Sequence, residues 1–285
     1  MDEITLKALA KINLGLDVVR RREDGYHEVR MIMQTIHLYD LLEIQKIREP
    51  EIQIVSNLSF LPVNENNLVY KAARLLQEEF ALTDGISVKL TKRIPVAAGM
   101  AGGSTDAAAM LYAMNQLYDL GLSRRELMKR GVQIGADVPY CLMRGTALAE
   151  GIGEKLTQLP PLIAKPSISV STRFVYQNLK LDEQTNHPDI DALMKDIREK
   201  DFDGVCAHMG NVLESVTIPN YPVIAEIKQQ MMRSGAKASM MSGSGPTVFG
   251  LFEDGETAKR ALREMKRSGL AKQVYLTTIY NNRRK

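Results

Sequence analysis

The stretch Pro95-Val-Ala-Ala-Gly99-Met-Ala-Gly102-Gly103-Ser104-Thr105 runs directly into an alanine-rich segment at 107–114. A glycine-dense turn that opens a helix directs several backbone N–H groups, and the positive end of the helix dipole, at one point. A phosphate group fits such a point. The stretch therefore predicts a nucleotide phosphate site, and the alternative is an ordinary helix start with Ser104 or Thr105 as the N-cap.

Two familiar phosphate loops do not fit this stretch. A Walker A loop ends in Gly-Lys-Ser/Thr, whereas Gly103 is followed directly by Ser104 and Thr105. A dinucleotide-binding turn needs Gly-x-Gly-x-x-Gly after a strand, and the spacing Gly99-x-x-Gly102-Gly103 differs from it. The cation and the base that phosphoryl transfer requires must therefore come from elsewhere in the chain.

Composition excludes several classes of protein. The 285 residues include 37 basic and 34 acidic ones, so the net charge of +3 does not indicate a nucleic-acid-binding surface. With 45% hydrophobic residues the chain can bury a substantial core, and its length suits two domains. No apolar run reaches the ~20 residues of a membrane span, and the start has no basic n-region. We expect a cytoplasmic protein, monomer or homodimer, without nucleic-acid or membrane partners.

Periodicity indicates mixed strands and helices. Strands are predicted at 4–14, 31–36, 41–47, 52–55, 86–90, 167–170, 247–252 and 274–279. Helices are predicted at 67–77, in the alanine-rich segment, at 124–134 after an N-cap at Ser123, and at 190–199, 205–216, 222–234 and 257–268. Because no strict βαβ rhythm appears, we expect an α+β fold whose second half is a small sheet with helices on one side. The linker signal at Leu159-Pro160-Pro161 predicts domains 1–160 and 161–285.

Two residues are candidates for the missing cation and base. Lys11 projects with Asn13 from the face of the first strand opposite its apolar face, and its alternative is a solvated strand lysine. Asp137 lies in the tight turn Gly135-Ala-Asp137-Val-Pro139. A carboxylate there can accept a hydroxyl proton when a neighbouring ammonium sets its pKa. The alternative is a turn aspartate that satisfies local amides.

Two further turns are candidates for ligand contact. Ser242-Gly243-Ser244-Gly245-Pro246 offers backbone that can approach phosphate or substrate, with a plain hairpin loop as the alternative. Tyr26 and His27 follow Gly25, where an aromatic plane and an imidazole can stack on and read a base. The alternative is a packing tyrosine beside an exposed histidine.

Three of these stretches resemble the motifs of the GHMP kinases, in the order and at separations that suit this superfamily: 10–14, 95–105 and 241–247. Within it, the stretches 24–27, 135–139 and 149–153 resemble the kinases of 4-diphosphocytidyl-2-C-methyl-D-erythritol in the non-mevalonate isoprenoid (MEP) pathway. The resemblance covers essentially the whole chain. It implies a two-domain GHMP kinase fold, with an N-terminal domain like ribosomal S5 domain 2 and a ferredoxin-like C-terminal domain.

The resemblance also implies an activity and its residues. ATP would phosphorylate the C2 hydroxyl of the substrate, with Asp137 as general base and Lys11 holding that carboxylate ionised. Mg²⁺ is implied with ATP, its ligands being unknown apart from the Ser104 hydroxyl as a candidate. The implied ATP-binding residues are Pro95, Val96, Ala97, Ala98, Gly99, Met100, Ala101, Gly102, Gly103, Ser104, Thr105, Asn67, Leu68 and Lys92. The implied substrate-binding residues are Asn13, Tyr26, His27, Tyr176, Gly243, Ser244 and Gly245, with Tyr26, His27 and Tyr176 at the cytosine.

Four positions depart from the pattern of the superfamily. Leu9 stands where proline is common, and Met100 and Thr105 stand where leucine and serine are usual. Tyr176 stands where phenylalanine is often found, which keeps an aromatic ring for stacking. None of these departures alters Lys11 or Asp137. Two other functions stay open: another GHMP kinase acting on homoserine, mevalonate or a sugar, and a GHMP-fold sensor that binds nucleotide or metabolite without catalysis. Loss of the lysine or of the base would be the signature of the sensor.

Overall fold

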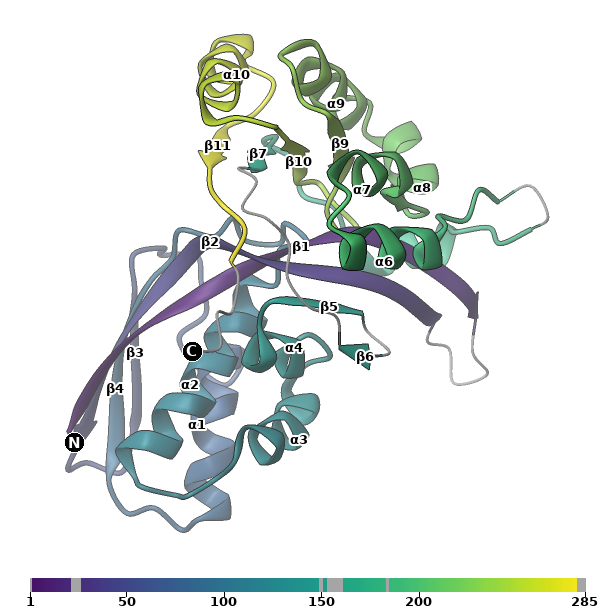
Figure 1. The fold of residues 1–285 in the computed structure, drawn as a ribbon. Helices are drawn as coiled ribbons and strands as arrows, with labels where there is room; N and C mark the ends of the chain where they lie inside the picture. Colours follow the sequence, from purple (N-terminus) through teal and green to yellow (C-terminus); the bar gives the residue numbers. More distant parts are fainter. Residues whose placement is uncertain (1, 22–26, 149–150, 153–160, 183–184, 281–285) are drawn as a thin grey trace. The chain divides into compact units, whose positions relative to one another are not determined.

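The computed structural model describes residues 2–21, 27–148, 151–152, 161–182 and 185–280 (Figure 1). The chain forms two compact units, each built from separated segments. The first unit comprises Met1–Ala10, Leu38–Val96 and Ala101–Arg144, and the second comprises Lys11–His37, Ala97–Met100 and Gly145–Lys285. Two long strands, β1 (Glu3–Arg21) and β2 (His27–Ile47), run through both units.

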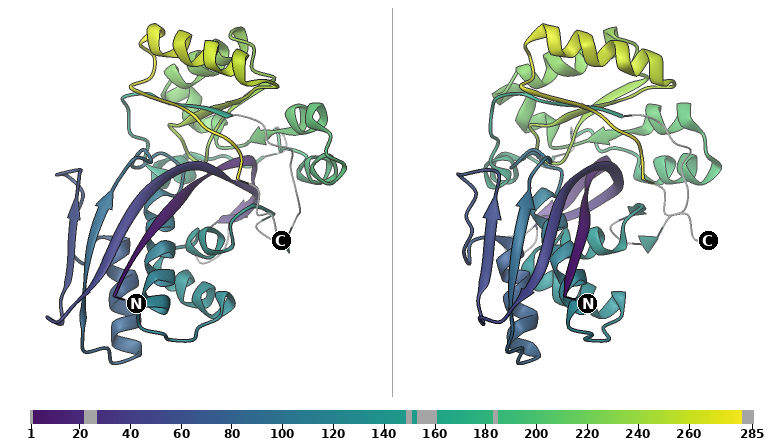
Figure 2. Two further views of the ribbon diagram at one scale, coloured as in Figure 1. Left: turned by 60° about the vertical axis from the view of Figure 1, so that its left-hand side comes forward. Right: turned by 90° about the vertical axis from the view of Figure 1, so that its left-hand side faces the viewer.

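The first unit is a sheet covered by helices. β3 (Ile52–Ser56) pairs in parallel with β4 (Gly85–Thr91), and β4 pairs antiparallel with Leu41–Ile47 of β2. The helices are α1 (Leu68–Glu79), α2 (Gly102–Leu117), α3 (Arg124–Ile134) and α4 (Val138–Met143). In Figures 1 and 2, α1 and α2 lie on one face of this sheet. The run Thr105–Leu111 is buried all round, and its alanines let α2 approach its neighbours closely.

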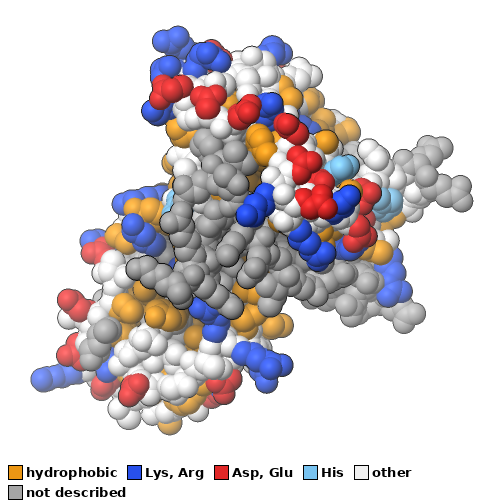
Figure 3. Space-filling model, in the orientation of Figure 1, with side chains coloured by type: hydrophobic (Ala, Val, Ile, Leu, Met, Phe, Trp, Pro, Cys, Tyr) orange, Lys and Arg blue, Asp and Glu red, His pale blue; other side chains and the backbone are white. Residues whose placement is uncertain are grey.

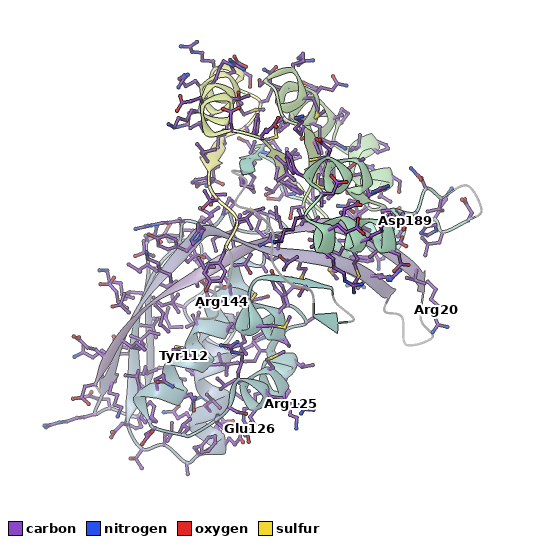
Figure 4. All side chains as sticks on the ribbon, in the orientation of Figure 1. Arg20, Tyr112, Arg125, Glu126, Arg144 and Asp189 are labelled. Carbon is purple, nitrogen blue, oxygen red and sulfur yellow. The ribbon has the colours of Figure 1, made fainter. Side chains whose placement is uncertain are left out.

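Side-chain caps fix two of these helices where the sequence predicts them. Asn67 accepts a hydrogen bond from the Val69 N–H through Oδ1 at 2.9 Å, so α1 begins directly after it. Ser123 and Glu126, the latter labelled in Figure 4, form a reciprocal capping box at the start of α3. By contrast, α2 begins at Gly102 and has no side-chain cap. Ser104 and Thr105 lie inside that helix, so their alternative role as its N-cap is wrong.

The second unit contains a four-stranded antiparallel sheet in the order β11–β7–β10–β9. These strands are β7 (Pro161–Lys165), β9 (Ala238–Met241), β10 (Val248–Leu251) and β11 (Gln273–Leu276). Figures 1 and 2 show α9 (Val223–Arg233) and α10 (Gly255–Ser268) on one face of it. The predicted small sheet with helices on one side is therefore confirmed. Apolar residues of both helices and the sheet form one buried cluster.

The remaining elements of the second unit surround the second part of β1 and the first part of β2. β5 (Thr146–Leu148) pairs with β2 at Ile32–Gln34, and β6 (Gly151–Ile152) pairs with β5. β8 (Gly210–Asn211) pairs in parallel with Gly15 and Leu16 of β1. The helices here are α5 (Thr172–Asn178), α6 (Ile190–Glu199), α7 (Phe202–His208) and α8 (Glu214–Asn220).

Four predicted elements differ from the structure. The strands predicted at 31–36 and 41–47 are two parts of one continuous strand, β2, and each part pairs with a different partner. The helix predicted at 205–216 is interrupted by β8, because pairing with β1 overrides the helical spacing. The strand predicted at 167–170 is wrong: β7 ends at Lys165, before Pro166, which has no N–H for a ladder. The predicted domain boundary at 160 lies outside the described residues.

The surface agrees with the nearly balanced charge. On the face in Figure 3, basic and acidic side chains intermingle over α9 and α10. Among the described residues, no helix has the length and apolar character needed to traverse a bilayer.

Candidate functional site

Lys11 and Asn13 are neighbours on β1. The Lys11 ammonium donates to Asn13 Oδ1 at 2.8 Å, and Asn13 Nδ2 lies 3.2 Å from the sulfur of Met31. The prediction that the two side chains share a face is thus confirmed. The face is not solvated, because Lys11 is 5% and Asn13 0% exposed. The alternative of a solvated strand lysine is therefore wrong, and so is the expectation that β1 buries only one face.

Two segments distant in sequence meet beside this pair. The Lys11 N–H donates to the carbonyl of Met100 at 3.2 Å, and the Ser242 hydroxyl donates to the carbonyl of Gly99 at 3.1 Å. A Cβ on Gly99, whose φ is +72°, would lie 2.2 Å from the Ser242 carbonyl oxygen. Only glycine fits there. A Cβ on Gly243 would lie 3.3 Å from Gly99. Parts of all three motifs therefore meet within the second unit.

The turn 242–246 is also tied to α5. The hydroxyls of Thr172 and Ser244 share a hydrogen bond of 2.8 Å. Thr172 was not among the predicted residues, because nothing in the sequence pairs a helix start with a turn so distant. Tyr176, on the same helix, is half-buried and packs against the apolar cluster of the second unit. Tyr26 lies outside the described residues, so its pairing with Tyr176 stays a prediction.

In the first unit, the start of α2 leaves its backbone donors without a side-chain cap. Ala97, Gly99 and Ala101 have φ values of 51°, 72° and 55°. The left-handed backbone is uncommon for alanine, and such strain concentrates at ligand sites. The first N–H groups of a helix, aligned with its dipole, favour an anion. The helix start is therefore a candidate anion site.

Several predicted residues surround this helix start. Leu68 Cδ1 lies 3.4 Å from the place of a Cβ on Gly103, and the Ser104 hydroxyl lies 3.9 Å from the place of a Cβ on Gly135. Gly135 begins the turn that carries Asp137. Asp137 is half-buried at the N-cap position of α4, and its side chain makes no capping hydrogen bond. The structure therefore brings the turn of Asp137 to the first turn of α2.

Lys92 occupies a different environment from the one expected of a nucleotide contact. Its ammonium donates to Asp106 Oδ2 at 2.6 Å and to Asp40 Oδ2. All three side chains are almost fully buried. Asp40 Oδ1 also accepts from the N–H groups of Arg93 and Ile94, the latter at 2.8 Å. This buried cluster of Lys92, Asp40 and Asp106, the ionic anchor, thus fixes the chain just before the loop at 95–105.

The ionic anchor shifts the titration of its members. Burial alone lowers the pKa of Lys92, but the carboxylates of Asp106 and Asp40 more than offset this, so its pKa is raised. Burial raises the pKa of Asp106 well above its usual range. Asp106 Oδ1 is buried and has no hydrogen-bond partner among the described residues. Sequence reasoning missed Asp40 and Asp106. Asp40 lies within the apolar stretch 38–42, and an aspartate in such a stretch is a signal for a buried partner.

Two other predicted residues either have a structural role or lie outside the described residues. The Asn67 side chain caps α1 through Oδ1 and donates from Nδ2 to the Pro62 carbonyl at 2.7 Å. His27 begins β2, and its side chain lies outside the described part. No group of three or more His, Cys, Asp or Glu side chains that could hold a metal ion occurs among the described residues.

Two family models match the chain. The model of the GHMP kinases N terminal domain matches residues 67–145, and that of the GHMP kinases C terminal matches residues 193–271. These matches and the mixed helices and strands confirm the predicted α+β GHMP kinase fold.

Whole-chain relatives give a closer likeness. A protein of Lachnospira eligens named 4-diphosphocytidyl-2-C-methyl-D-erythritol kinase is 58% identical, over 98% of this chain and 99% of its own. One of Lachnoclostridium phytofermentans with the same name is 54% identical, over 99% of each chain.

Solved structures agree with the relatives. A crystal structure of 4-(cytidine 5'-diphospho)-2C-methyl-D-erythritol kinase matches with a TM-score of 0.83 and 30% identity, over 98% of this chain and 100% of its own. A homoserine kinase of Cytophaga hutchinsonii, with a TM-score of 0.79 and 20% identity over 98% of this chain and 95% of its own, shares the fold. Full-length likeness of this strength confirms the predicted family: the chain belongs to the GHMP kinases and, among them, to the 4-diphosphocytidyl-2-C-methyl-D-erythritol kinase family.

Proposed function

We propose that the protein transfers the γ-phosphoryl group of ATP to the C2 hydroxyl of 4-diphosphocytidyl-2-C-methyl-D-erythritol in the non-mevalonate isoprenoid pathway. Membership of a kinase family named for this substrate supports the choice of acceptor. The observation that carries the proposal is the meeting of Lys11 with Met100 and of Gly99 with Ser242, through hydrogen bonds of 3.2 and 3.1 Å. It joins parts of the three superfamily motifs around one buried lysine.

In the proposed reaction, Asp137 accepts the proton of the C2 hydroxyl while that oxygen attacks the γ-phosphorus in line. Lys11 keeps the Asp137 carboxylate ionised and offsets charge that develops on the transferred group. Asn13 orients the Lys11 ammonium through their 2.8 Å hydrogen bond and helps hold the substrate near its reacting oxygen. Direct transfer is proposed, because no nucleophile suited to a phosphoenzyme stands out in the motifs.

The other assignments follow the family. Tyr26, His27 and Tyr176 would bind the cytosine, and Gly243, Ser244 and Gly245 would bind the rest of the substrate. The loop 95–105, with Asn67 and Leu68, would bind ATP. The uncapped start of α2 and the left-handed loop backbone fit its phosphates. For Lys92 we propose an indirect part, because its ammonium is occupied by two carboxylates.

A magnesium ion fits this site through the nucleotide rather than through a protein cage. Mg²⁺ with ATP is usually held by substrate phosphates, water and one or two protein oxygens. The half-buried Ser104 hydroxyl in the first turn of α2 is such an oxygen. The ion would neutralise charge on the phosphates.

A cytoplasmic location and a monomeric or homodimeric state complete the proposal.

The test is ADP release from Mg-ATP with 4-diphosphocytidyl-2-C-methyl-D-erythritol, homoserine and mevalonate as separate acceptors. We expect turnover only with the first. Asp137→Asn should lower kcat by about 100-fold or more, the loss expected of a general base. Asp254→Asn is the matched control, because Asp254 is also at an N-cap position and asparagine can replace it as a cap.

Two results would contradict the proposal. Turnover on homoserine or mevalonate would assign the chain to another GHMP activity. Nucleotide binding without turnover on any acceptor would indicate the sensor. Thermal unfolding of Asp137→Asn alongside the wild type separates loss of the base from loss of the fold.

A further inference from the structure

The segment 211–214 supplies side-chain hydrogen bonds that hold the end of β9 and the turn 242–246. Asn211, on β8, donates from Nδ2 to the carbonyls of Met241 and Gly243, at 2.9 and 2.8 Å. Its Oδ1 accepts from the Leu213 N–H at 3.0 Å. Both amide hydrogens and the oxygen are therefore used, and the residue is only 7% exposed. The two carbonyls and the N–H fix which way the amide points.

A second side chain of the same segment holds the other side of Met241. Glu214 accepts from the Met241 N–H at 2.8 Å through Oε1, and from the Lys228 ammonium at 2.5 Å through Oε2. Both backbone polar groups of Met241 are thus bound by side chains of residues 211–214. Strand β9 ends there, and the turn begins. The position of the turn is set by Asn211 and Glu214 together.

The turn bears directly on the loop beside Lys11. Ser242 bonds to the Gly99 carbonyl, and Gly99 approaches the Ser242 carbonyl so closely that a Cβ would lie 2.2 Å from it. The next loop carbonyl, that of Met100, receives the Lys11 N–H at 3.2 Å. Close-packed backbone transmits displacement, so a shift of the turn must move Gly99 and its neighbour. This series of contacts lies within the second unit.

We propose that Asn211 is a positioning residue for phosphoryl transfer, holding the turn 242–246 so that Gly99 and Met100 are seated against Lys11. The inference rests on the proposed function. Misplacing reacting groups by about 1 Å can cost about 100-fold in rate. Asn211 thus acts through the turn and the loop, and its loss should lower kcat more than it changes KM.

The test compares Asn211→Asp with Asn115→Asp. In Asn211→Asp, a carboxylate oxygen replaces the NH₂ group and faces two carbonyl oxygens, while the Leu213 bond is retained. Asn115 is a matched control: it is 6% exposed and binds the N–H and the carbonyl of Leu122, each at 2.9 Å, in the first unit. Both variants should lower the melting temperature. Only Asn211→Asp should lower kcat, by about 10- to 100-fold.

Two further measurements separate positioning from simple destabilisation. The lost kcat of Asn211→Asp should partly return as pH falls, because a protonated carboxyl regains one donor, and burial raises the pKa of such a group. Amide hydrogen exchange should become faster at Lys11 and in 242–247 in this variant and stay unchanged there in Asn115→Asp. This second readout needs no turnover.

The outcomes distinguish the two proposals. Equal loss of kcat in both variants, or unchanged exchange at Lys11 in Asn211→Asp, would overturn the positioning role. Absence of turnover in the wild type would overturn the proposed function, and hydrogen exchange would still decide whether Asn211 holds the loop.

Discussion

Lys11 and Lys92 are both buried, 5% and 7% exposed, yet their surroundings differ. Lys92 lies between the carboxylates of Asp40 and Asp106, which neutralise its charge and hold it. Lys11 donates to the amide oxygen of Asn13, which orients the ammonium. The comparison teaches that burial alone does not assign the role of a lysine, because two carboxylates hold Lys92 in the fold, whereas parts of three motifs meet at the backbone around Lys11.

The same contrast separates the two ends of the loop. At its entry, the ionic anchor fixes Arg93 and Ile94 through Asp40. Further along, neutral groups hold Gly99 and Met100, namely the Ser242 hydroxyl and the Lys11 N–H. We expect these two kinds of contact to respond differently to substitution and to pH.

The largest expected effect is on stability. Lys92→Met leaves two buried carboxylates without their cation, and breaking a buried ion pair from one side costs about 3–5 kcal/mol. The free energy of unfolding, measured in urea, should fall by this amount. Ser123→Ala is the reference variant. It removes the capping box of α3 and should lower the free energy of unfolding by only about 1 kcal/mol.

One result for Lys92→Met would contradict the contrast between Lys92 and Lys11. A loss no larger than that of Ser123→Ala, together with a large rise in KM for ATP, would make Lys92 a nucleotide contact, as the family resemblance alone implies.

The second effect is on catalysis. Lys11→Met removes the cation that offsets developing charge, so kcat should fall about 100- to 1000-fold. Loss of this donor also leaves the Asn13 oxygen unsatisfied, which should cost about 1–3 kcal/mol. Paired kinetics and urea unfolding measure both quantities. An unchanged kcat in Lys11→Met would contradict the proposed role of Lys11.

The smallest effect concerns pH and the ionic anchor. The folded pKa of Asp106 is raised by burial, so the folded state keeps a proton that the unfolded state releases near pH 3.8. The wild type should therefore lose stability as pH rises from this value through the raised pKa, by at most about 1.4 kcal/mol per pH unit. Asp106→Asn cannot titrate, so its stability curve should be flatter as pH rises above the unfolded pKa. Parallel curves for the two proteins would contradict the raised pKa.

Local signals predicted much of the fold. Ser123 is a cap that acts within one turn of helix, and it was correctly predicted. Asn67 was predicted as the first residue of a helix, and the structure makes it the cap of that helix. The shared face of Lys11 and Asn13 follows from strand alternation alone. By contrast, β8 forms because Gly210 and Asn211 pair with a strand almost two hundred positions earlier, and no local pattern contains that information.

The residues of the candidate site also divide into those that local sequence predicts and those that depend on distant contacts. Motifs identified Lys11, Asp137 and the loop, because glycine and polar residues stand out in an apolar background. Asn211 could not be predicted, since its significance lies in reaching the carbonyls of Met241 and Gly243. The occupied ammonium of Lys92 was also missed, since its partners Asp40 and Asp106 come from separate elements.

The separated segments of the second unit have a consequence for biosynthesis. Lys11 leaves the ribosome long before Ser242, which seats the loop beside it. A nascent chain can complete the helices of the first unit long before the second can close. The contacts around Lys11 therefore form only after the turn 242–246 has been made, and a product truncated before the turn would carry the lysine and the loop without the segment that seats them.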